Sequence, residues 1–253
     1  MKPVIHQKVL KVKNGEVLSL EDILATEAKI KIIINDKEII TLSATPLHIK
    51  ELVTGFIFTE EIVKTNWCPE EIKIIEEDKE IRVKIYSEDF LELSKKTLTS
   101  GCVSSFTFIN ELPKKYEDSF KIDIEKLFSL FKDFQKKSEL YKSTGCIHCA
   151  ALADSENIIF LAEDIGRHNA VDKVIGYALL NEITLRNKVL LISGRISSEM
   201  VLKAGKWKIP VIVSRSAPTS LAITLAEKIG LTVIGFLRGK RCNIYTHSQR
   251  VNF

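Results

Sequence analysis

The second half of the chain alternates short apolar runs with amphipathic stretches. Apolar residues at helical spacing predict helices at about residues 123–140, 169–181, 197–207 and 219–230. Short β-branched or leucine-rich runs predict strands at about residues 147–154, 157–162, 189–193, 210–214 and 231–236. Because short strands alternating with helices are typical of a sheet covered on both faces, the pattern predicts an α/β fold with three layers and parallel neighbouring strands over residues 116–253.

In the first half of the chain, the two-residue alternation typical of strands is more frequent than helical spacing. Residues 1–45 are expected to be mostly strands, and the turn pair Asn35-Asp36 between two apolar runs predicts a hairpin. A helix is expected from about Leu47 to Ile62, where apolar side chains share one face. Alternation at residues 71–75 and 80–86 predicts a second hairpin.

Residues 95–106 interrupt these patterns. Small and hydroxyl side chains surround a single Gly101-Cys102 pair there, and no period is sustained, which predicts a loop. We therefore expect a smaller α+β domain over residues 1–115 that ends in the Cys102 loop, followed by the α/β domain. Lys95 and Lys96 are near enough in sequence to favour the thiolate of this cysteine.

Polar stretches follow the apolar runs of the second half at four places. They are residues 163–173, 193–195, 214–219 and 235–241. In an open α/β sheet the ends of parallel strands meet at one edge, and ligands bind there. Each stretch carries arginine, and the planar guanidinium donates to two phosphate oxygens at once. The sequence therefore predicts a pocket for a multiply charged anion at this edge.

Two helix starts lie inside these stretches. Ser197 and Thr219 are expected to cap the helices that follow them, since their side-chain oxygens suit the first turn. Unpaired N–H groups at such starts attract anions, which adds to the same pocket.

Composition and charge narrow the function classes. The 253 residues are 45% hydrophobic and 28% charged, which is typical of a globular protein, and the net charge of +4 is too small to imply nucleic acid. Bases concentrate in residues 206–253, which favours a phosphate-rich ligand, although a solvated basic surface gives the same pattern. Residues 1–8 have no apolar core of signal-peptide length, and no apolar run approaches a membrane span, so we expect a cytoplasmic protein without membrane contact.

The cysteines form an odd set. They are Cys68, Cys102, Cys146, Cys149 and Cys242. In a reducing compartment such a set predicts thiols, ligands or nucleophiles rather than a disulfide framework.

The four polar stretches together resemble the motif set of the formate dehydrogenase accessory sulfurtransferase family. The resemblance also includes Thr144–Ala150, Thr45-Pro46, and the position of Gly101-Cys102, and so covers nearly the whole chain. It implies a cytidine-deaminase-like fold in the C-terminal half and a homodimer. Many members carry a second cysteine in the loop, where this chain has Ser105.

The resemblance also implies a function. The family accepts sulfur from a cysteine desulfurase as a persulfide, here on Cys102, and delivers it to the bis-guanylyl molybdopterin cofactor (Mo-bis(molybdopterin guanine dinucleotide)) for formate dehydrogenase. The segment that would bind this cofactor is Phe236, Leu237, Arg238, Gly239, Lys240 and Arg241. We add Arg195, Ser216, Arg167 and His168 from the neighbouring stretches as cofactor-binding residues, and expect no resident metal.

Several alternatives stay open at this point. Cys102 can be an incidental loop cysteine, in which case the protein is a non-catalytic chaperone for the cofactor. Cys146, His148 and Cys149 invite a zinc site and hence a zinc-dependent nucleotide deaminase, but the second cysteine pair and the glutamate of such enzymes are missing. His168 can contact the ligand or cap a helix, and Asp172 is expected in a salt bridge.

Overall fold

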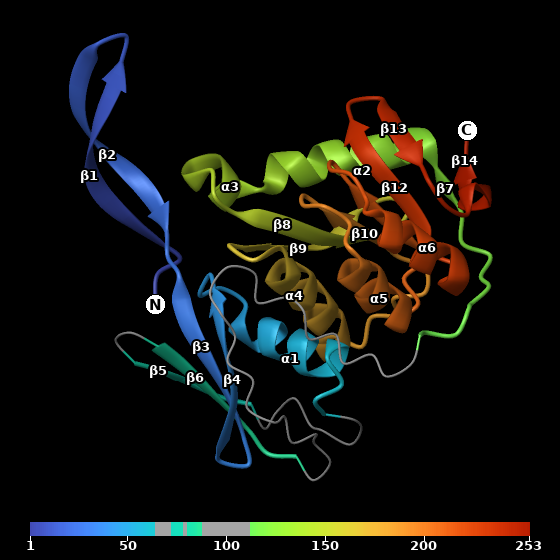
Figure 1. Cartoon of the computed structure of the whole chain (residues 1–253), viewed down its shortest axis with the longest axis horizontal. Helices are drawn as coiled ribbons and strands as arrows, with labels where there is room; N and C mark the ends of the chain where they lie inside the picture. The colour runs from blue at the N-terminus through green and yellow to red at the C-terminus, as the bar shows by residue number, and fades with distance from the viewer. Residues whose placement is uncertain (64–71, 78–79, 88–111) are drawn as a thin grey trace.

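The structure is a computed structural model, and it describes residues 1–63, 72–77, 80–87 and 112–253. Within them, a six-stranded sheet forms the centre of the C-terminal half (Figure 1). Its order is β13-β12-β11-β10-β8-β9, made of β8 (His148–Ala153), β9 (Ile158–Asp164), β10 (Val189–Ile192), β11 (Val211–Ser214), β12 (Thr232–Arg238) and β13 (Arg241–Ile244). β10, β11 and β12 are parallel neighbours, whereas β8 and β13 run the other way.

Helices cover both faces of this sheet. Figure 1 shows α2 (Ile124–Lys137) on one side and α4 (Arg167–Leu180), α5 (Ser198–Lys206) and α6 (Ser220–Ile229) on the other. Alternate strand residues face opposite layers, so that Leu190 and Ile212 join the core under α4–α6, whereas Leu191 and Val213 join the core under α2. The near-continuous apolar runs of the strands follow from this double burial, and the expected three-layer α/β arrangement is confirmed.

The N-terminal half has a separate core. In the described residues, β4-β3-β6-β5 form a four-stranded sheet of β3 (Ala28–Ile34), β4 (Lys37–Ala44), β5 (Lys73–Glu76) and β6 (Glu80–Ile85). Its buried face packs on α1 (Ile49–Thr59). Asn35 and Asp36 have φ values of 49° and 61°, which a tight hairpin turn requires. Both hairpins and the helix expected from the sequence are thus confirmed, although α1 is shorter than predicted.

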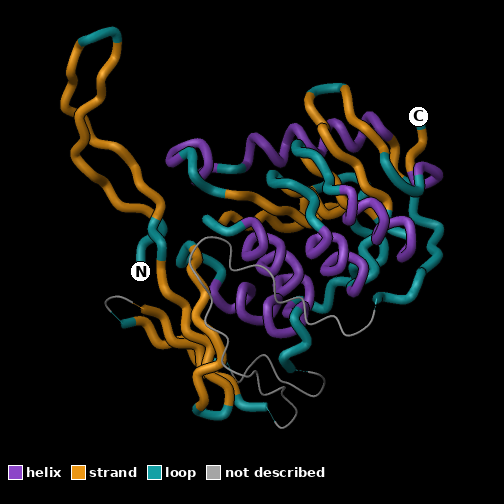
Figure 2. Tube along the Cα trace, in the orientation of Figure 1, coloured by secondary structure: helices purple, strands orange, loops and turns teal. Residues whose placement is uncertain are grey.

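A long hairpin precedes this half. It consists of β1 (Val4–Lys13) and β2 (Glu16–Ala25), joined by Asn14 and Gly15. We call it the arm. Figure 1 shows the arm projecting from the body of the molecule, and Figure 2 shows that strands make up nearly all of its length. Near its base the arm contacts the short helix α3 (Glu139–Thr144).

The end of the chain closes back on the middle. β14 (Val251–Asn252) pairs with β7 (Ile122–Asp123), next to the 3-10 turn η2 (Ser248–Arg250). The guanidinium of Arg250 is buried and donates to Asp118 over 2.7 Å. The backbone N–H of Tyr116 donates to the carbonyl oxygen of Ile229, so the chain directly after residue 115 already packs on the C-terminal layer. The domain boundary expected at 115 and the cytidine-deaminase-like type both stay predictions.

The two halves meet where α1 crosses α4. Gly55 and Gly176 lie at the crossing: a methyl group on Gly176 would lie 1.9 Å from the carbonyl oxygen of Glu51, and one on Gly55 would lie 1.8 Å from that of Asp172. No side chain fits in such a space, so the two helix backbones approach closely because both positions are glycine.

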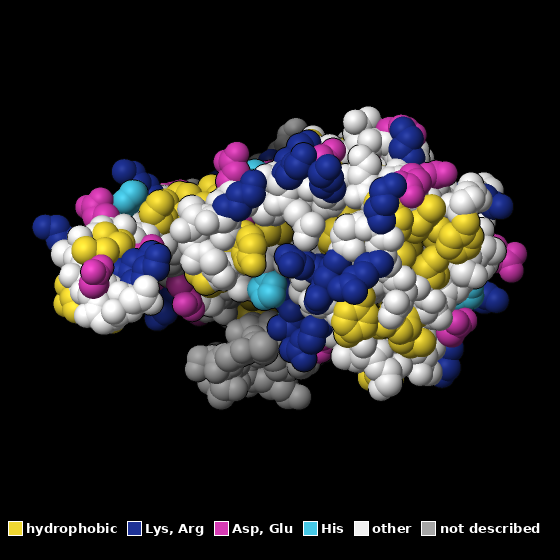
Figure 3. Space-filling view, turned by 90° about the horizontal axis from the view of Figure 1, so that it is seen from above, with side chains coloured by type: hydrophobic (Ala, Val, Ile, Leu, Met, Phe, Trp, Pro, Cys, Tyr) yellow, Lys and Arg dark blue, Asp and Glu magenta, His cyan; other side chains and the backbone are white. Residues whose placement is uncertain are grey.

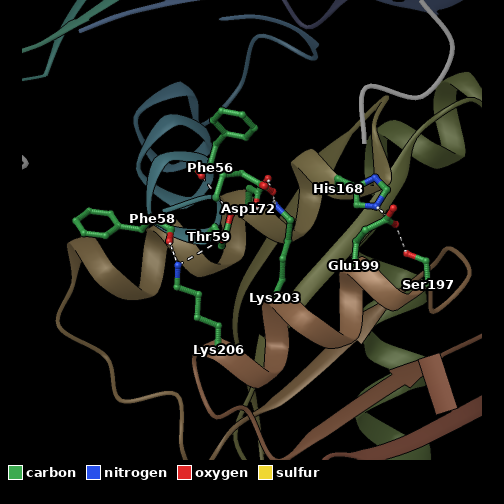
Figure 4. Close-up of polar contacts among 10 residues, drawn as sticks. Phe56, Phe58, Thr59, His168, Asp172, Ser197, Glu199, Lys203 and Lys206 are labelled. Atoms are coloured by element: carbon green, nitrogen blue, oxygen red, sulfur yellow. Dashed lines mark hydrogen bonds and ion pairs between the residues drawn. The ribbon is translucent and has the colours of Figure 1, made fainter. Parts of the chain in front are cut away.

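A buried ion network fastens the same crossing (Figure 4). Lys203 of α5 lies 2.7 Å from Asp172 of α4 and 2.8 Å from Glu60 at the end of α1. Thr59 donates to Asp172 over 2.9 Å. Burial raises the pKa of Glu60, although the Lys203 ammonium beside it acts in the opposite direction. The salt bridge expected for Asp172 is therefore confirmed, with Lys203 as its partner.

One prediction about the sheet is wrong. The sequence placed a strand end at Phe236 and a loop after it, but β12 continues to Arg238 and β13 begins at Arg241. The register shifts between Gly235 and Arg238, and Phe236 has a φ of 54°. A bulge of this kind breaks the two-residue alternation, which is why the apolar pattern ended early.

Candidate functional site

The four polar stretches lie at one edge of the sheet. β9 is antiparallel to β8, and β8 is antiparallel to β10, so β9 runs in the same direction as β10, β11 and β12. The carboxyl ends of these four strands therefore point the same way, as the sequence predicted. The N-terminus of α4 follows β9 at this edge, and those of α5 and α6 follow β10 and β11.

Hydrogen bonds join the loops after β10 and β11 to each other and to β12, and so form one platform. Ser214 donates to the carbonyl oxygen of Gly194 over 2.6 Å, and the Ser216 hydroxyl donates to that of Ser193 over 3.3 Å. The backbone N–H of Phe236 donates to the Ser216 carbonyl over 3.1 Å. The Ser216 hydroxyl thus already donates its one proton to the backbone. It can bind a ligand only as an acceptor, or as a donor after that bond breaks.

Cationic side chains gather above this platform. Those exposed at the strand ends are Arg195, Arg215, Arg238 and Arg241. Figure 3 shows Lys and Arg side chains grouped near the middle of the face seen from above, beside a histidine. Exposed guanidinium groups on backbone-tied loops suit the oxygens of a phosphate group, since their donors lie in a fixed fork.

Gly194 brings an arginine and a histidine together. A methyl group there would lie 3.4 Å from Cβ of Arg167 and 3.4 Å from Nδ1 of His148. His148 Nδ1 is also 3.4 Å from the hydroxyl of Ser193. Burial, and after it the positive charge of Arg167, lowers the pKa of His148, so this imidazole is neutral at pH 7. The half-buried Arg167 is therefore the innermost of the predicted site arginines.

His168 is held by a carboxylate that the sequence analysis did not pair with it. Its Nε2 lies 3.3 Å from an oxygen of Glu199, which also accepts from the Ser197 hydroxyl over 2.8 Å (Figure 4). Burial, followed by the charges of Arg167 and Lys203, lowers the pKa of His168 to about 3. A neutral imidazole that donates from Nε2 to Glu199 presents Nδ1 as an acceptor.

The expected roles at the helix starts need correction. His168 is not a cap, because α4 begins at Arg167 with Gly166 as its cap residue. Ser197 precedes α5 but makes no cap hydrogen bond to the backbone, since its hydroxyl goes to Glu199. Thr219 does cap α6, accepting from the N–H of Ala222 over 3.3 Å. Local spacing identified the residues that precede the helices. It did not show that the Glu199 carboxylate takes the Ser197 hydroxyl away from the helix backbone.

The side chains of residues 236–241, around the turn between β12 and β13, point partly to solvent and partly into the core. Phe236, Arg238, Gly239, Lys240 and Arg241 are exposed, whereas Leu237 is buried in the core under α2. The side chain of Leu237 is therefore unavailable to a ligand, and only its backbone can contribute. Lys240 lies 2.8 Å from Glu125 at the start of α2.

A groove runs between this hairpin and α2. It has a volume of about 470 Å³, and its lining combines Phe128, Phe131 and Leu237 with polar side chains that include Lys132 and Lys240. Its apolar floor and charged rim are the combination that small-molecule sites use.

The cysteines fall into different surroundings. Cys102 and the rest of the expected loop 95–106 lie outside the described residues, so the structure does not test that prediction. Cys149 is buried in β8, and burial raises the pKa of its thiol to about 12. Cys146 is exposed. Over the described ranges, no three His, Cys, Asp or Glu side chains group as metal ligands.

The comparisons with known proteins agree with one another. The FdhD/NarQ family model matches residues 25–252. Two relatives named sulfur carrier protein FdhD, from Bacillus pumilus and Bacillus subtilis, are each 38% identical, over 99% and 96% of this chain and 97% and 95% of their own lengths. A crystal structure described as that of a formate dehydrogenase accessory protein from Desulfotalea psychrophila has a TM-score of 0.81 at 27% identity, covering 99% of this chain and 100% of that one.

Proposed function

The chain belongs to the FdhD/NarQ family, and on that premise we propose that it is a sulfur carrier for the maturation of formate dehydrogenase. In this proposal Cys102 takes persulfide sulfur from a cysteine desulfurase and delivers it to Mo-bis(molybdopterin guanine dinucleotide), which is the substrate. The protein acts in the cytoplasm and as a homodimer. Across the described segments, every helix is too short or too polar to cross a lipid bilayer.

The loading step needs only the Cys102 thiolate and the persulfide of the desulfurase. The Cys102 thiolate attacks the outer sulfur of the desulfurase persulfide, a new S–S bond forms on Cys102, and the desulfurase cysteine leaves as a thiolate. The outer sulfur keeps its proton, so no oxidant or reductant is consumed. Cys149 is a poor substitute for Cys102, because its thiol is buried and its pKa is raised.

The observation that carries the proposal is the cationic edge of the sheet. Arg195, Arg238 and Arg241 stand exposed at strand ends, where they can meet the phosphate oxygens of a guanine dinucleotide. Phe236 is 38% exposed beside them and offers a ring to a purine. His168 contributes a neutral acceptor, since Glu199 occupies its other nitrogen.

Trapping the persulfide tests the sulfur-carrier claim. The protein is incubated with a cysteine desulfurase and cysteine, alkylated, and digested for mass spectrometry of the peptide containing Cys102. We expect one added sulfur on Cys102 in the wild type and none at that site in Cys102→Ser, while Cys146→Ser loads normally. If Cys102 carries no sulfur but the protein still binds the cofactor, the chain is a cofactor chaperone instead.

Guanine-nucleotide binding tests the cationic edge. Replacing Arg238 or Arg241 by Ala is expected to weaken binding of a guanosine diphosphate probe by about 1.5–3 kcal/mol, the usual value of a hydrogen bond to a charged group. Titration calorimetry measures this, with Lys228→Ala, an exposed base near the other end of α6, as the control. Equal affinity of all three variants would remove the nucleotide role of the edge.

A zinc-dependent deaminase would need a metal. Elemental analysis of the purified protein is expected to find far less than one zinc per chain. A stoichiometric zinc that is lost in a Cys146→Ser, Cys149→Ser double variant would instead favour the deaminase.

A further inference from the structure

The residue that follows β4 binds the first of the four polar stretches. This residue, Thr45, is buried. Its backbone N–H donates to Oδ2 of Asp164 over 3.0 Å, and its carbonyl oxygen accepts from Nζ of Lys173 over 3.0 Å. Its hydroxyl oxygen accepts from the backbone N–H of Ile165 over 3.1 Å. Both backbone groups and the hydroxyl of Thr45 therefore bind residues of the stretch 163–173.

Asp164 lies at the centre of these contacts, and its side chain is 0% exposed. Its Oδ2 accepts from Thr45 and, over 2.6 Å, from Nζ of Lys173. Its Oδ1 accepts from the backbone N–H of Gly166 over 2.8 Å and from Nδ2 of Asn169 over 2.9 Å. The buried carboxylate is therefore satisfied at both oxygens, so this arrangement is well determined.

A second residue of the N-terminal half supports the same turn. Nδ2 of Asn169 also donates to the carbonyl oxygen of Ser43 in β4 over 2.9 Å. Gly166 packs so closely on this amide that a methyl group at Gly166 would lie 2.8 Å from Nδ2. The turn between β9 and α4 is therefore held by the N-terminal half of the chain as well as by its own half.

This turn leads directly into Arg167 and His168, the first two residues of α4. Their side chains lie against Gly194 and Glu199, respectively. The two backbone N–H groups that precede them both donate to side chains, the first of them to the hydroxyl of Thr45. The first N–H groups of a helix have no partner within the helix. Side-chain hydrogen bonds therefore fix the backbone from which both site residues extend.

We propose that Thr45 is a positioning residue for Arg167 and His168 at the cationic edge. It acts through the turn 164–166, which its hydroxyl and its backbone N–H hold in place. The predicted cofactor-binding residues all belong to the C-terminal half, and this contact from the N-terminal half completes their arrangement. The inference rests on the nucleotide binding of the proposed function and adds a residue that acts on it without touching the ligand.

A purely structural contact between the halves is the alternative, and the α1–α4 contact provides an example. Thr59 is 1% exposed, donates to Asp172 over 2.9 Å and accepts from Lys203 over 2.9 Å. Thr45 and Thr59 are thus both buried threonines of the N-terminal half whose hydroxyls bind the C-terminal half. The hydroxyl of Thr45, however, binds the backbone two residues before Arg167. Replacing each by Val removes a hydroxyl and keeps the branched shape, so the two variants form a matched pair.

Binding of guanosine diphosphate to the full chain separates the two roles. Titration calorimetry should show affinity weakened about five- to tenfold in Thr45→Val, which corresponds to about one lost hydrogen bond. Thr59→Val should bind as tightly as the wild type, although its urea midpoint should fall at least as far, because its hydroxyl bonds to charged groups. Thr45→Ser keeps the hydroxyl and should keep the wild-type affinity.

The imidazole of His168 provides a measurement that needs no ligand. Its ring resonances in an NMR spectrum are identified by their loss in His168→Gln. In Thr45→Val these resonances should move, because the ring is displaced relative to Glu199. In Thr45→Ser they should stay at their wild-type positions.

The outcomes separate this inference from the proposed function. Affinity that is unchanged in Thr45→Val, or weakened equally in Thr59→Val, would overturn the positioning role and leave the nucleotide site standing. A wild type that binds no guanosine diphosphate would remove the nucleotide role of the edge, and the resonances of His168 then decide the inference alone. Resonances that do not move in Thr45→Val overturn it, and a movement absent from Thr45→Ser supports it.

Discussion

The α1–α4 contact and the arm bury their side chains to opposite extents. At the contact, helix backbones touch at Gly55 and Gly176, and Lys203 is 3% exposed between two carboxylates. In the arm, Leu10 is 71% exposed and the charges lie in solvent. The contact is complete within one chain, so substitutions there should affect folding. The arm buries none of its side chains, so substitutions there should affect folding little.

The largest expected effect comes from breaking the ion network. Lys203→Met should lower the free energy of unfolding by about 3–5 kcal/mol, because Asp172 and Glu60 would remain buried without a counter-charge. Urea unfolding at one fixed protein concentration measures this. Lys8→Met is the matched control in the arm. A loss below 1 kcal/mol at Lys203 would mean that the network does not fasten the two halves.

A smaller but still large effect comes from adding one methyl group at the helix crossing. Gly176→Ala should cost about 3 kcal/mol, because the new carbon meets the carbonyl oxygen of Glu51 and the helices must separate. Val17→Ile adds a methyl group in the arm instead, and should change stability by less than about 0.5 kcal/mol. Equal melting temperatures for the two variants would contradict the close approach of α1 and α4.

The next effect is a pH dependence confined to the body of the molecule. His168 has a folded-state pKa of about 3 against an ordinary value of 6.5, so between these values the unfolded chain binds a proton that the folded chain does not. Its contribution to stability is therefore present above pH 6.5 and is lost as the pH falls towards 3.

Comparing wild type with His168→Gln isolates this effect. On going from pH 7 to pH 5, the wild type should lose about 2 kcal/mol more than the variant. Chemical unfolding at both values measures it. Parallel pH profiles for the two proteins would show that burial does not lower the pKa of His168.

The smallest expected effect concerns the arm itself. Val12→Ser should change the free energy of unfolding by less than about 0.5 kcal/mol, since the side chain is already exposed. Hydrogen exchange should meanwhile be fast in the arm and slow at the α1–α4 contact. Strong protection of the arm would contradict the contrast between the two regions.

The sequence predicted much of the fold because much of it follows local periods. The alternation in β3, β4 and β6, the turn at Asn35-Asp36, and the four strand ends were all visible as patterns of two or 3.6 residues. The prediction failed at Phe236, where a bulge breaks the period, and it missed the short strands β7 and β14. Two-residue strands have too few positions to show any alternation.

The candidate site was less accessible to sequence reasoning. The exposed arginines were predicted from residue type and position. The hydrogen bonds from Ser216 to the Ser193 carbonyl and between His168 and Glu199 were not predicted. Glu199 lies 31 residues from His168, so no local spacing connects them. Likewise Leu237 was placed in the binding segment, and only the packing under α2 shows its side chain to be core.

By itself, then, the sequence determined the order of strands and helices, the strand ends that carry arginine, and the likeness to a family. These depend on residues close together in the chain or on motifs that can be read directly. Tertiary structure alone decided that Gly55 meets Asp172 and Gly176 meets Glu51, that Lys203 joins three helices, and that the arm stands unburied. Burial depends on contacts between segments that are distant in the chain, and the local hydrophobic pattern does not specify which segments make these contacts.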